Sequence, residues 1–433
     1  MNYFKIHILA VALLFTAIVV AQQTPAVKQK QGVSIEGATA HLGNGQVIEN
    51  SLIMFENGKL AFVGSANSRI ARLGQIINAK GKHVYPGFIA PNSTLGLVEI
   101  DAVRATKDND EVGLMNPHIR SLIAYNTESK VVESMRPNGV LMAQVTPRGG
   151  RISGTSSIVQ LDAWNWEDAV VKKDDGVHLN WPNPFSRGRW WLGEPATLKV
   201  NTNYKKQVEA LTNYFVESKA YITGNKKPKH LPFEALQGLV DGAKTLYVHV
   251  SNEKGITDAI RFSKENNIKK MVIVGGYEAN LVANLLKYNN IPVLLQRVHS
   301  RPNTDDGDYD ASFKMANDLV KAGVLVGLEN AGDMERMNTR NLPFLAGTCA
   351  AYGLTKEEAL SLITLNTAKI LGISDRVGSL EVGKDATLFI SEGDALDMRT
   401  NKLTKAYIEG RDISLESHQT ELYKRYSNKY KNQ

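Results

Sequence analysis

The sequence is poor in cysteine and in aromatic residues. Its 433 residues include one cysteine, Cys349, which excludes an intramolecular disulfide, a cysteine-based zinc site and an iron–sulfur cluster. Any metal ion must therefore be held by histidines and carboxylates. Aromatic residues make up only 7% of the chain, whereas 43% is hydrophobic and 22% is charged, which is typical of a globular protein.

The chain also lacks a strong charge of one sign. Its 51 lysines and arginines and its 44 aspartates and glutamates leave a formal net charge of +7. The excess is scattered along the chain, which argues against a nucleic-acid-binding protein. We therefore expect a small-molecule substrate or ligand and no nucleic-acid partner. A basic, tyrosine-containing segment at 416–433 is predicted to be a solvated helix or tail.

Long apolar runs are missing as well. The candidate run begins at Ile8 and ends at Ala21, with only Thr16 polar inside it, and it is shorter than the ~20 residues that a membrane-spanning helix requires. The basic residue before it and the polar stretch after it predict a secretory signal peptide at 1–21. A membrane anchor is the alternative. We expect an exported protein, periplasmic or secreted, in which 22–32 forms a linker.

Short apolar segments of two kinds fill the rest of the chain. Segments typical of antiparallel strands occupy 33–85 and return at 375–415. Between them, strand-like runs alternate with amphipathic helical runs, as in parallel β/α units. The sequence predicts an α/β fold in which both ends of the chain build a composite sheet domain beside a barrel or doubly wound domain at 86–374. The predicted strands of that second domain include 140–145, 246–250, 271–274, 293–295 and 324–328.

A segment at about 100–232 interrupts this alternation. It contains all five tryptophans of the chain and several prolines. Because so apolar a segment is not a flexible linker, we expect it to pack as an insertion beside the mouth of the barrel, as a lid or a pocket wall. An interface between copies of the chain in a homo-oligomer is the alternative.

Two blocks of sequence carry a resemblance to a known family. Residues 83–89 read His-Val-Tyr-Pro-Gly-Phe-Ile, and residues 378–386 read Gly-Ser-Leu-Glu-Val-Gly-Lys-Asp-Ala. Both resemble the metal-dependent amidohydrolase superfamily, in particular its imidazolonepropionase-like group. The resemblance implies a TIM-like (β/α)8 barrel flanked by a β-sandwich that both termini form. It also implies hydrolysis of a non-peptide C–N bond in a cyclic amide, a ureide or a dipeptide-like substrate.

The metal ligands of that superfamily are mostly missing. Its members follow Pro-Gly-Phe-Ile with an aspartate and then two histidines separated by one residue, whereas Asn92 and Thr94 occupy the histidine positions here. Amide and hydroxyl oxygens are poor zinc ligands. By resemblance, His249 matches a later metal ligand, and Glu329 or Asp333 matches the carboxylate that follows the last strand. We therefore expect a degenerate metal site that holds one weakly bound divalent ion such as zinc, or none.

Losing the metal changes what the site can catalyse. Bound zinc lowers the pKa of water from ~15.7 to ~7, which corresponds to a free energy of deprotonation lower by roughly 12 kcal/mol. General acid–base catalysis lowers the activation barrier by only roughly 3–5 kcal/mol. If the protein is a hydrolase, we expect Glu329, Asp333 and His299 to be its catalytic residues. The alternative is a catalytically inactive member that binds a ligand or pairs with an intact amidohydrolase paralogue.

Polar residues near predicted strand ends are candidates for substrate binding. Arg148 and Arg151 lie in a glycine-rich loop after a predicted strand, where guanidinium groups are suited to hold an anionic group. A tight turn with surface arginines is the alternative. Asn92 and Thr94 follow the first predicted barrel strand and are assigned to the same pocket. His178 stands alone in the sequence and is predicted to be a structural histidine.

Overall fold

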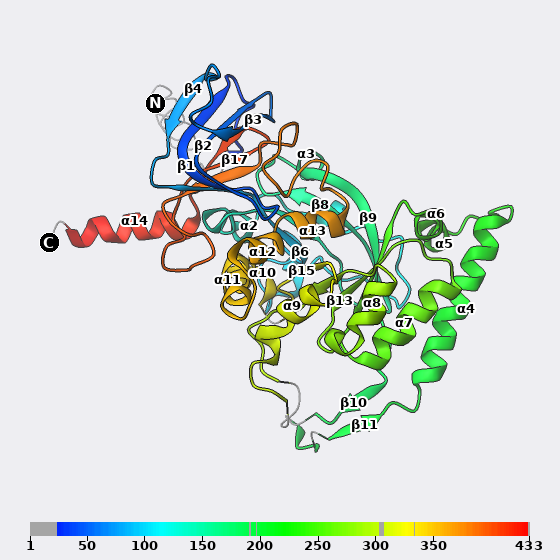
Figure 1. Ribbon diagram of the computed structural model, residues 1–433. Helices are drawn as coiled ribbons and strands as arrows, with labels where there is room; N and C mark the ends of the chain where they lie inside the picture. The colour runs from blue at the N-terminus through cyan, green and yellow to red at the C-terminus, as the bar shows by residue number, and fades with distance from the viewer. Residues whose placement is uncertain (1–23, 190–191, 196, 303–306, 333, 432–433) are drawn as a thin grey trace, which may run out of the picture.

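The computed structural model describes residues 24–189, 192–195, 197–302, 307–332 and 334–431. The predicted signal peptide at 1–21 and Asp333 lie outside these residues. Within them, no helix combines the length and the apolar character needed to span a bilayer. Two eight-stranded sheets organise the fold (Figure 1).

Both ends of the chain build the first sheet, as the sequence predicts. Its order is β18-β17-β16-β5-β1-β2-β3, and β4 also pairs with β1. The antiparallel pairing of β5 with β16 places Tyr85 opposite Phe389 and joins the two ends of the chain. Figure 1 shows these strands together at one end of the molecule. The boundaries at 33–85 and 375–415 remain predictions. The strands are β1 (Val33–His41), β2 (Val47–Glu56), β3 (Lys59–Ser65), β4 (Gln75–Asn78), β5 (His83–Pro86), β16 (Leu388–Ser391), β17 (Leu403–Ile408) and β18 (Arg411–Ile413).

The second sheet is barrel-like and confirms the mixed α/β fold. Neighbouring strands pair in parallel except at β8, which is antiparallel to β7 and to β9. Gly149 and Gly150, with φ of 79° and 59°, reverse the direction of the chain between β7 and β8. No helix therefore follows β7, and β8 departs from the regular β/α repeat. In order, the strands are β6 (Phe88–Ser93), β7 (Val140–Val145), β8 (Ile152–Gln160), β9 (Val170–Asn180), β12 (Thr245–Val250), β13 (Met271–Gly275), β14 (Val293–Leu295) and β15 (Val326–Leu328).

Residues 362–363 bridge the first and last strands of this sheet. The backbone N–H of Leu328 in β15 donates to the carbonyl of Leu362 over 3.1 Å. The N–H of Ile89 in β6 donates to the carbonyl of Ile363 over 2.9 Å. Because these two acceptors are adjacent in the chain, β6 and β15 are held near each other without a direct strand pairing. The sheet is thus nearly closed.

Helices cover the outside of the barrel-like sheet. In α7, Ile256, Ala259 and Ile260 lie on one buried face, as helical spacing requires. The terminal helix α14 has no buried residue and projects from the body in Figure 1. The helices are α2 (Lys130–Glu133), α3 (Trp166–Ala169), α4 (Tyr204–Thr223), α5 (Leu231–Ala235), α6 (Gln237–Asp241), α7 (Glu253–Glu265), α8 (Ala283–Tyr288), α9 (Ala311–Lys321), α10 (Glu335–Asn338), α11 (Leu342–Ala351), α12 (Lys356–Ser361), α13 (Leu365–Leu371) and α14 (His418–Lys431), and a separate hairpin joins β10 (Phe185–Arg187) to β11 (Leu198–Val200).

Strand β12 shows how side chains alternate between the two faces of the barrel. Leu246, Val248 and Val250 belong to the large core that includes the helices. Tyr247 belongs to a smaller cluster formed with neighbouring barrel strands. Because successive side chains of a strand point to opposite faces, His249 lies on the same inner face as Tyr247. The fold therefore places an imidazole inside the barrel at the carboxyl end of β12.

The tryptophan-rich insertion packs only in part. Trp181 is 6% exposed, and its Nε1 donates to the Tyr204 hydroxyl over 3.0 Å. Trp164 is 64% exposed. Trp190 and Trp191 lie outside the described residues. The role of the insertion as a lid or as an interface between copies remains a prediction.

Candidate active site

A pocket of about 390 Å³ opens at the carboxyl ends of the barrel strands. Barrel proteins place their functional sites at this end of the strands. The residues that end or closely follow five strands line the pocket: Asn92 in β6, His249 in β12, Gly275 in β13, Gln296 after β14 and Glu329 after β15. Trp181 brings the insertion into the wall. The structure thus gathers Asn92, His249 and Glu329, three residues that the sequence singled out.

Glu329 is a buried carboxyl group in the wall of this pocket. It is 3% exposed, and burial raises its pKa to about 7, with a smaller contribution from the negative charge of Glu335. Its Oε2 accepts hydrogen bonds from the Ala331 N–H at 2.7 Å and from Asn92 Nδ2 at 3.0 Å, and both oppose the rise. A carboxyl group with this pKa exchanges a proton near neutral pH, as a general acid or base must.

Asn92 owes its position to an unusual backbone conformation. Its φ is 49°, in the left-handed region that asparagine tolerates better than most residues. Its N–H donates to Gln144 Oε1 over 3.0 Å, and its carbonyl accepts from Arg148 Nη2 over 2.8 Å. These bonds fix the end of β6 and direct the Asn92 amide toward Glu329.

His249 is bonded to a second histidine that sequence reasoning assigned a structural role. Nε2 of His249 lies 2.8 Å from Nδ1 of His178 in β9. Burial lowers the pKa of His249 to about 3, and the charge of Arg148 adds to the effect. Burial also lowers the pKa of His178 well below its usual range, followed by contributions from His249 and Arg148. Both imidazoles are therefore neutral at physiological pH.

A buried polar network continues behind this histidine pair. Nε2 of His178 lies 2.9 Å from Ser156 Oγ, which donates to Asp175 Oδ1 over 2.7 Å. Asp175 Oδ2 accepts from the Tyr247 hydroxyl at 2.7 Å and from Gln144 Nε2 at 2.9 Å. Burial raises the pKa of Asp175, whereas these donors oppose the rise. The network links the floor of the pocket to the interior of the barrel.

The two predicted substrate-binding arginines are engaged by protein groups. Arg148 Nη2 donates to Glu335 at 2.9 Å and to the carbonyl of Asn92. Arg151 Nη1 donates to the carbonyl of Asn180 over 2.7 Å. Neither arginine is among the residues that line the pocket. Arg148 thus ties the turn between β7 and β8 to the end of β6, and Arg151 ties the same turn to the end of β9.

The remaining predicted site residues lie apart from the pocket wall. Thr94 is buried but does not line the pocket. His299 is exposed, and its Nε2 lies 2.8 Å from Thr348 Oγ1, away from Glu329 and His249 in the contacts described. Asp333 lies outside the described residues. Of the three predicted catalytic residues, only Glu329 is seen in the pocket wall.

Comparisons with known proteins identify relatives of this chain. Residues 227–413 match the amidohydrolase family. An imidazolonepropionase of Flavobacterium johnsoniae is 21% identical over 88% of this chain and 93% of its own. A 5-methylthioadenosine/S-adenosylhomocysteine deaminase of Thermoanaerobacter pseudethanolicus is 23% identical over 80% of this chain and 82% of its own. The resemblance to the imidazolonepropionase-like amidohydrolase superfamily is confirmed.

The fold comparison adds a solved structure. An amidohydrolase from Thermotoga maritima superposes with a TM-score of 0.75 and 24% identity, covering 88% of this chain and 99% of that one. At this identity the likeness shows a shared amidohydrolase fold.

The amidohydrolase superfamily implies a metal ion, and the donor set tests that implication. The described part of the chain contains no group of three or more histidine, cysteine, aspartate or glutamate side chains placed to hold a metal. Asn92 stands at one of the usual histidine positions, and its amide donates to Glu329. Nε2 of His249 already faces another imidazole. The described residues do not fit the usual metal centre of the superfamily, so no catalytic step is derived through a metal.

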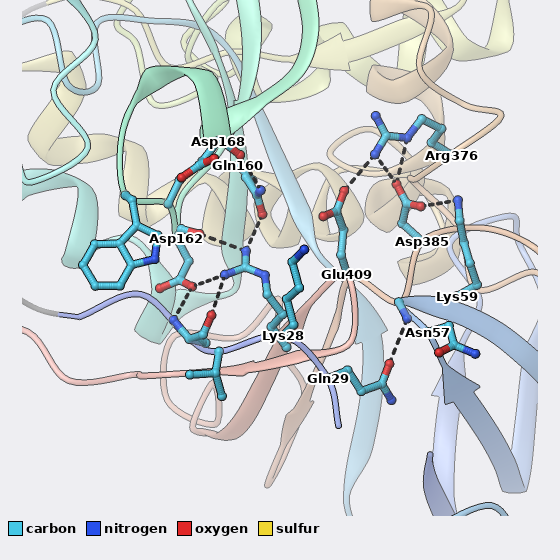
Figure 2. Close-up of a pocket in the computed structure, with 16 residues that line it drawn as sticks. Lys28, Gln29, Asn57, Lys59, Gln160, Asp162, Asp168, Arg376, Asp385 and Glu409 are labelled. Atoms are coloured by element: carbon cyan, nitrogen blue, oxygen red, sulfur yellow. Dashed lines mark hydrogen bonds and ion pairs between the residues drawn. The ribbon is translucent and has the colours of Figure 1, made fainter. Parts of the chain in front are cut away.

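A second pocket, of about 650 Å³, lies between the N-terminal segment, the composite sheet and the barrel (Figure 2). Its charged groups bind one another: Arg376 Nη2 lies 2.8 Å from Asp385, and Arg411 Nη1 lies 2.7 Å from Asp162. The backbone N–H of Ala26 also donates to Asp162 over 3.0 Å. These bonds fasten the N-terminal segment to the body of the protein, which accounts for the polar character of this pocket.

Proposed function

We propose that the protein is an exported hydrolase of the amidohydrolase superfamily that acts on a non-peptide C–N bond in a small cyclic amide, ureide or dipeptide-like substrate. Its scaffold is a (β/α)8-type barrel with a composite β-sandwich. The observation that carries the proposal is Glu329, a buried carboxyl group with a pKa of about 7 in the wall of a strand-end pocket. Imidazolonepropionase and deaminase relatives support hydrolysis of such bonds.

Glu329 performs both proton transfers in this proposal. As a carboxylate it takes a proton from the attacking water, and as a carboxylic acid it returns that proton to the leaving nitrogen. Asn92 Nδ2 and the Ala331 N–H hold Oε2 in place during both steps. General acid–base catalysis of this kind contributes about 10²-fold to 10⁴-fold. We expect a degenerate metal site, with at most one weakly bound divalent ion such as zinc.

Glu329→Gln tests the proposal against a panel of cyclic amides, N-acyl amino acids and dipeptides. Loss of the proton-transferring group lowers kcat by about 10²-fold or more for any substrate that the wild type cleaves. Glu265→Gln, an exposed carboxyl change at the end of α7, is the control and retains activity. Equal turnover by the wild type and Glu329→Gln contradicts the assigned role.

A catalytically inactive ligand-binding protein, or a partner subunit of an intact amidohydrolase paralogue, is the second candidate. The bond between His178 and His249 favours it, because that bond occupies an imidazole nitrogen of the expected metal ligand. Elemental analysis separates the candidates together with the substrate panel. Ligand binding without turnover, in a protein free of zinc, iron and manganese, supports the second candidate. Near-stoichiometric metal supports hydrolysis.

Export is proposed from the sequence and is tested separately. The N-terminal sequence of the protein recovered from the periplasm or medium identifies the cleavage site. Cleavage at the predicted end of the signal peptide gives a mature chain that begins near Gln22. An uncleaved N-terminus contradicts the prediction.

A further inference from the structure

Two side chains in the pocket present hydrogen-bonding atoms that no described protein group uses. Asn92 is 2% exposed, and its Oδ1 is buried without a partner among the described residues. His249 uses Nε2 in its contact with His178, and within the described chain nothing bonds to its Nδ1. Both residues line the same pocket. A buried polar atom without a partner is costly, so Asn92 Oδ1 marks a position that a ligand would satisfy, and the partly buried Nδ1 of His249 lies in the wall of the same pocket.

The hydrogen bonds behind His249 have a direction that is set at Asp175. The Tyr247 hydroxyl and Gln144 Nε2 donate to Asp175, so this carboxyl group acts as an acceptor. Ser156 donates its single hydroxyl hydrogen to Asp175 over 2.7 Å. The 2.9 Å contact between Ser156 Oγ and His178 Nε2 must therefore be donated by the imidazole.

The tautomers of both imidazoles follow from this direction. His178 is fully buried and neither imidazole bonds to a carboxylate, so nothing compensates a second hydrogen and each ring carries one. His178 has that hydrogen on Nε2, which leaves a lone pair on Nδ1. The 2.8 Å contact with His249 is then donated by Nε2–H of His249. His249 is left with a lone pair on Nδ1.

We propose that His178 is a positioning residue that holds His249 as the Nε2–H tautomer, so that His249 Nδ1 and Asn92 Oδ1 accept hydrogen bonds from an N–H donor group of the ligand. The inference rests on the pocket assigned in the proposed function. Glu329 adds a further acceptor to the same wall when it is ionised. The ligand class is a small molecule with an amidine or guanidine group.

The two arginines near the pocket bond to protein groups. Arg148 is engaged by Glu335 and by the carbonyl of Asn92, and Arg151 by the carbonyl of Asn180. Neither Arg148 nor Arg151 lines the pocket, so these two guanidinium groups do not meet a ligand at the wall formed by Asn92, His249 and Glu329. The interpretation of the two arginines as anion-binding groups is therefore not supported at this wall.

Histidine-selective ¹⁵N labelling of the full-length protein tests the tautomer directly. We expect His249, assigned by comparison with His249→Asn, to show a protonated Nε2 and an unprotonated Nδ1. Ser156→Ala removes the acceptor of His178 and yields a mixture of His249 tautomers. Ser157→Ala is the matched control, because Ser157 Oγ accepts from the Asp174 N–H over 2.9 Å in the wild type. This variant leaves the spectrum of His249 unchanged. Hydrogen on Nδ1 of His249 in the wild type, or an unchanged tautomer in Ser156→Ala, overturns the inference.

Binding of two small probes tests the ligand class. Acetamidinium and acetate have similar size and opposite hydrogen-bonding character. We expect saturable binding of acetamidinium and none of acetate, measured by ligand-observed NMR. Asn92→Ala and Ser156→Ala weaken acetamidinium binding by about 2-fold to 12-fold, the range for one hydrogen bond, whereas Ser157→Ala does not. Binding of acetate in preference to acetamidinium overturns the inference.

Failure of this inference is distinguishable from failure of the proposed function. A protein that shows the Nε2–H tautomer and binds acetamidinium but cleaves no C–N bond retains the inference and contradicts the hydrolase. A protein that hydrolyses a substrate with His249 protonated on Nδ1 retains the hydrolase and contradicts the inference.

Discussion

Nδ2 of Asn92 donates to Oε2 of Glu329 over 3.0 Å and thereby joins the ends of the first and last strands of the barrel-like sheet. The two strands make no direct pairing, so this bond and residues 362–363 span the same gap. The family resemblance assigns metal ligands to the positions of Asn92 and Glu329, and in this chain a direct amide–carboxyl contact joins the two side chains. Asn92 thereby orients the carboxyl group that we propose to transfer protons.

Asn92→Ala is expected to lower the free energy of unfolding more than Asn50→Ala does. Asn50, with φ of 47°, shares the left-handed backbone of Asn92 but is exposed and lacks a carboxyl partner. Alanine therefore adds similar strain, about 1–2 kcal/mol, at both positions. Loss of the bond to Glu329 should make Asn92→Ala worse by about 1–3 kcal/mol in urea unfolding. Equal losses in the two variants would show that the bond adds no stability.

The pKa of Glu329 gives a signed dependence of stability on pH. Because its folded pKa of about 7 lies above the ordinary 4.5, its contribution is fully present below pH 4.5 and is lost as pH rises through 7. Glu329→Gln should thus gain stability relative to the wild type between pH 4.5 and 8, on the order of 3 kcal/mol. Urea unfolding at several pH values measures this difference. A constant difference across that range contradicts a raised pKa.

Glu335→Gln should shift the same titration downward. Glu335 raises the pKa of Glu329, and it also neutralises Arg148, which opposes the rise. Removing its charge therefore lowers the pKa of Glu329 by both routes. Difference infrared titration of the carboxyl band, with Glu329→Gln as the assignment control, measures the midpoint. An unchanged or higher midpoint would mean that Glu335 does not act on Glu329.

The buried apolar strands could be predicted from the sequence, and the polar strand could not. The predicted segment 140–145 coincides with β7 and 293–295 with β14, because continuous apolar runs bounded by turns are typical of such strands. β8 was missed. Its residues Thr155, Ser156 and Ser157 are polar yet buried, and side-chain hydrogen bonds satisfy them. Hydropathy does not distinguish such a strand from a loop.

The same limit explains which site residues were missed. Asn92, His249 and Glu329 were singled out because the family resemblance assigns roles to their positions in the sequence, and all three line the pocket. His178 lies opposite Tyr247 only through the register between β9 and β12, and Ser156 reaches Asp175 only through the pairing of β8 with β9. Register between strands far apart in the chain is not encoded in the local pattern. The contact between His178 and His249 therefore could not be predicted from the sequence.

The neutral histidine pair predicts loss of stability in acid. The pKa of His249 is about 3 and that of His178 is also lowered, whereas unfolded histidines titrate near 6.5. Below pH 6.5 these two histidines bind protons in the unfolded chain but not in the folded chain. The free energy of unfolding therefore falls by up to about 1.4 kcal/mol per pH unit for each ring. His249→Asn should flatten this slope, and His418→Asn, at an exposed position in α14, should not. Identical slopes in all three proteins would contradict the lowered pKa values.

Asp162 should be the most sensitive charge of the second pocket (Figure 2). It is 1% exposed and binds Arg411 at 2.7 Å, Arg136 at 3.3 Å and the Ala26 N–H at 3.0 Å. Asp162→Asn leaves two largely buried arginines without their carboxylate, which typically costs about 3–5 kcal/mol. Asp168→Asn changes an exposed carboxyl group of the same pocket and is the matched control.

Urea unfolding measures that loss, and limited trypsin digestion locates it. Because Asp162 holds the backbone of Ala26, the variant should be cut faster after Lys28 than the wild type and Asp168→Asn. Faster cleavage without global unfolding would show that the bond fastens the N-terminal segment to the barrel. Equal stability and equal cleavage in the two variants would mean that the arginines find other partners when Asp162 loses its charge.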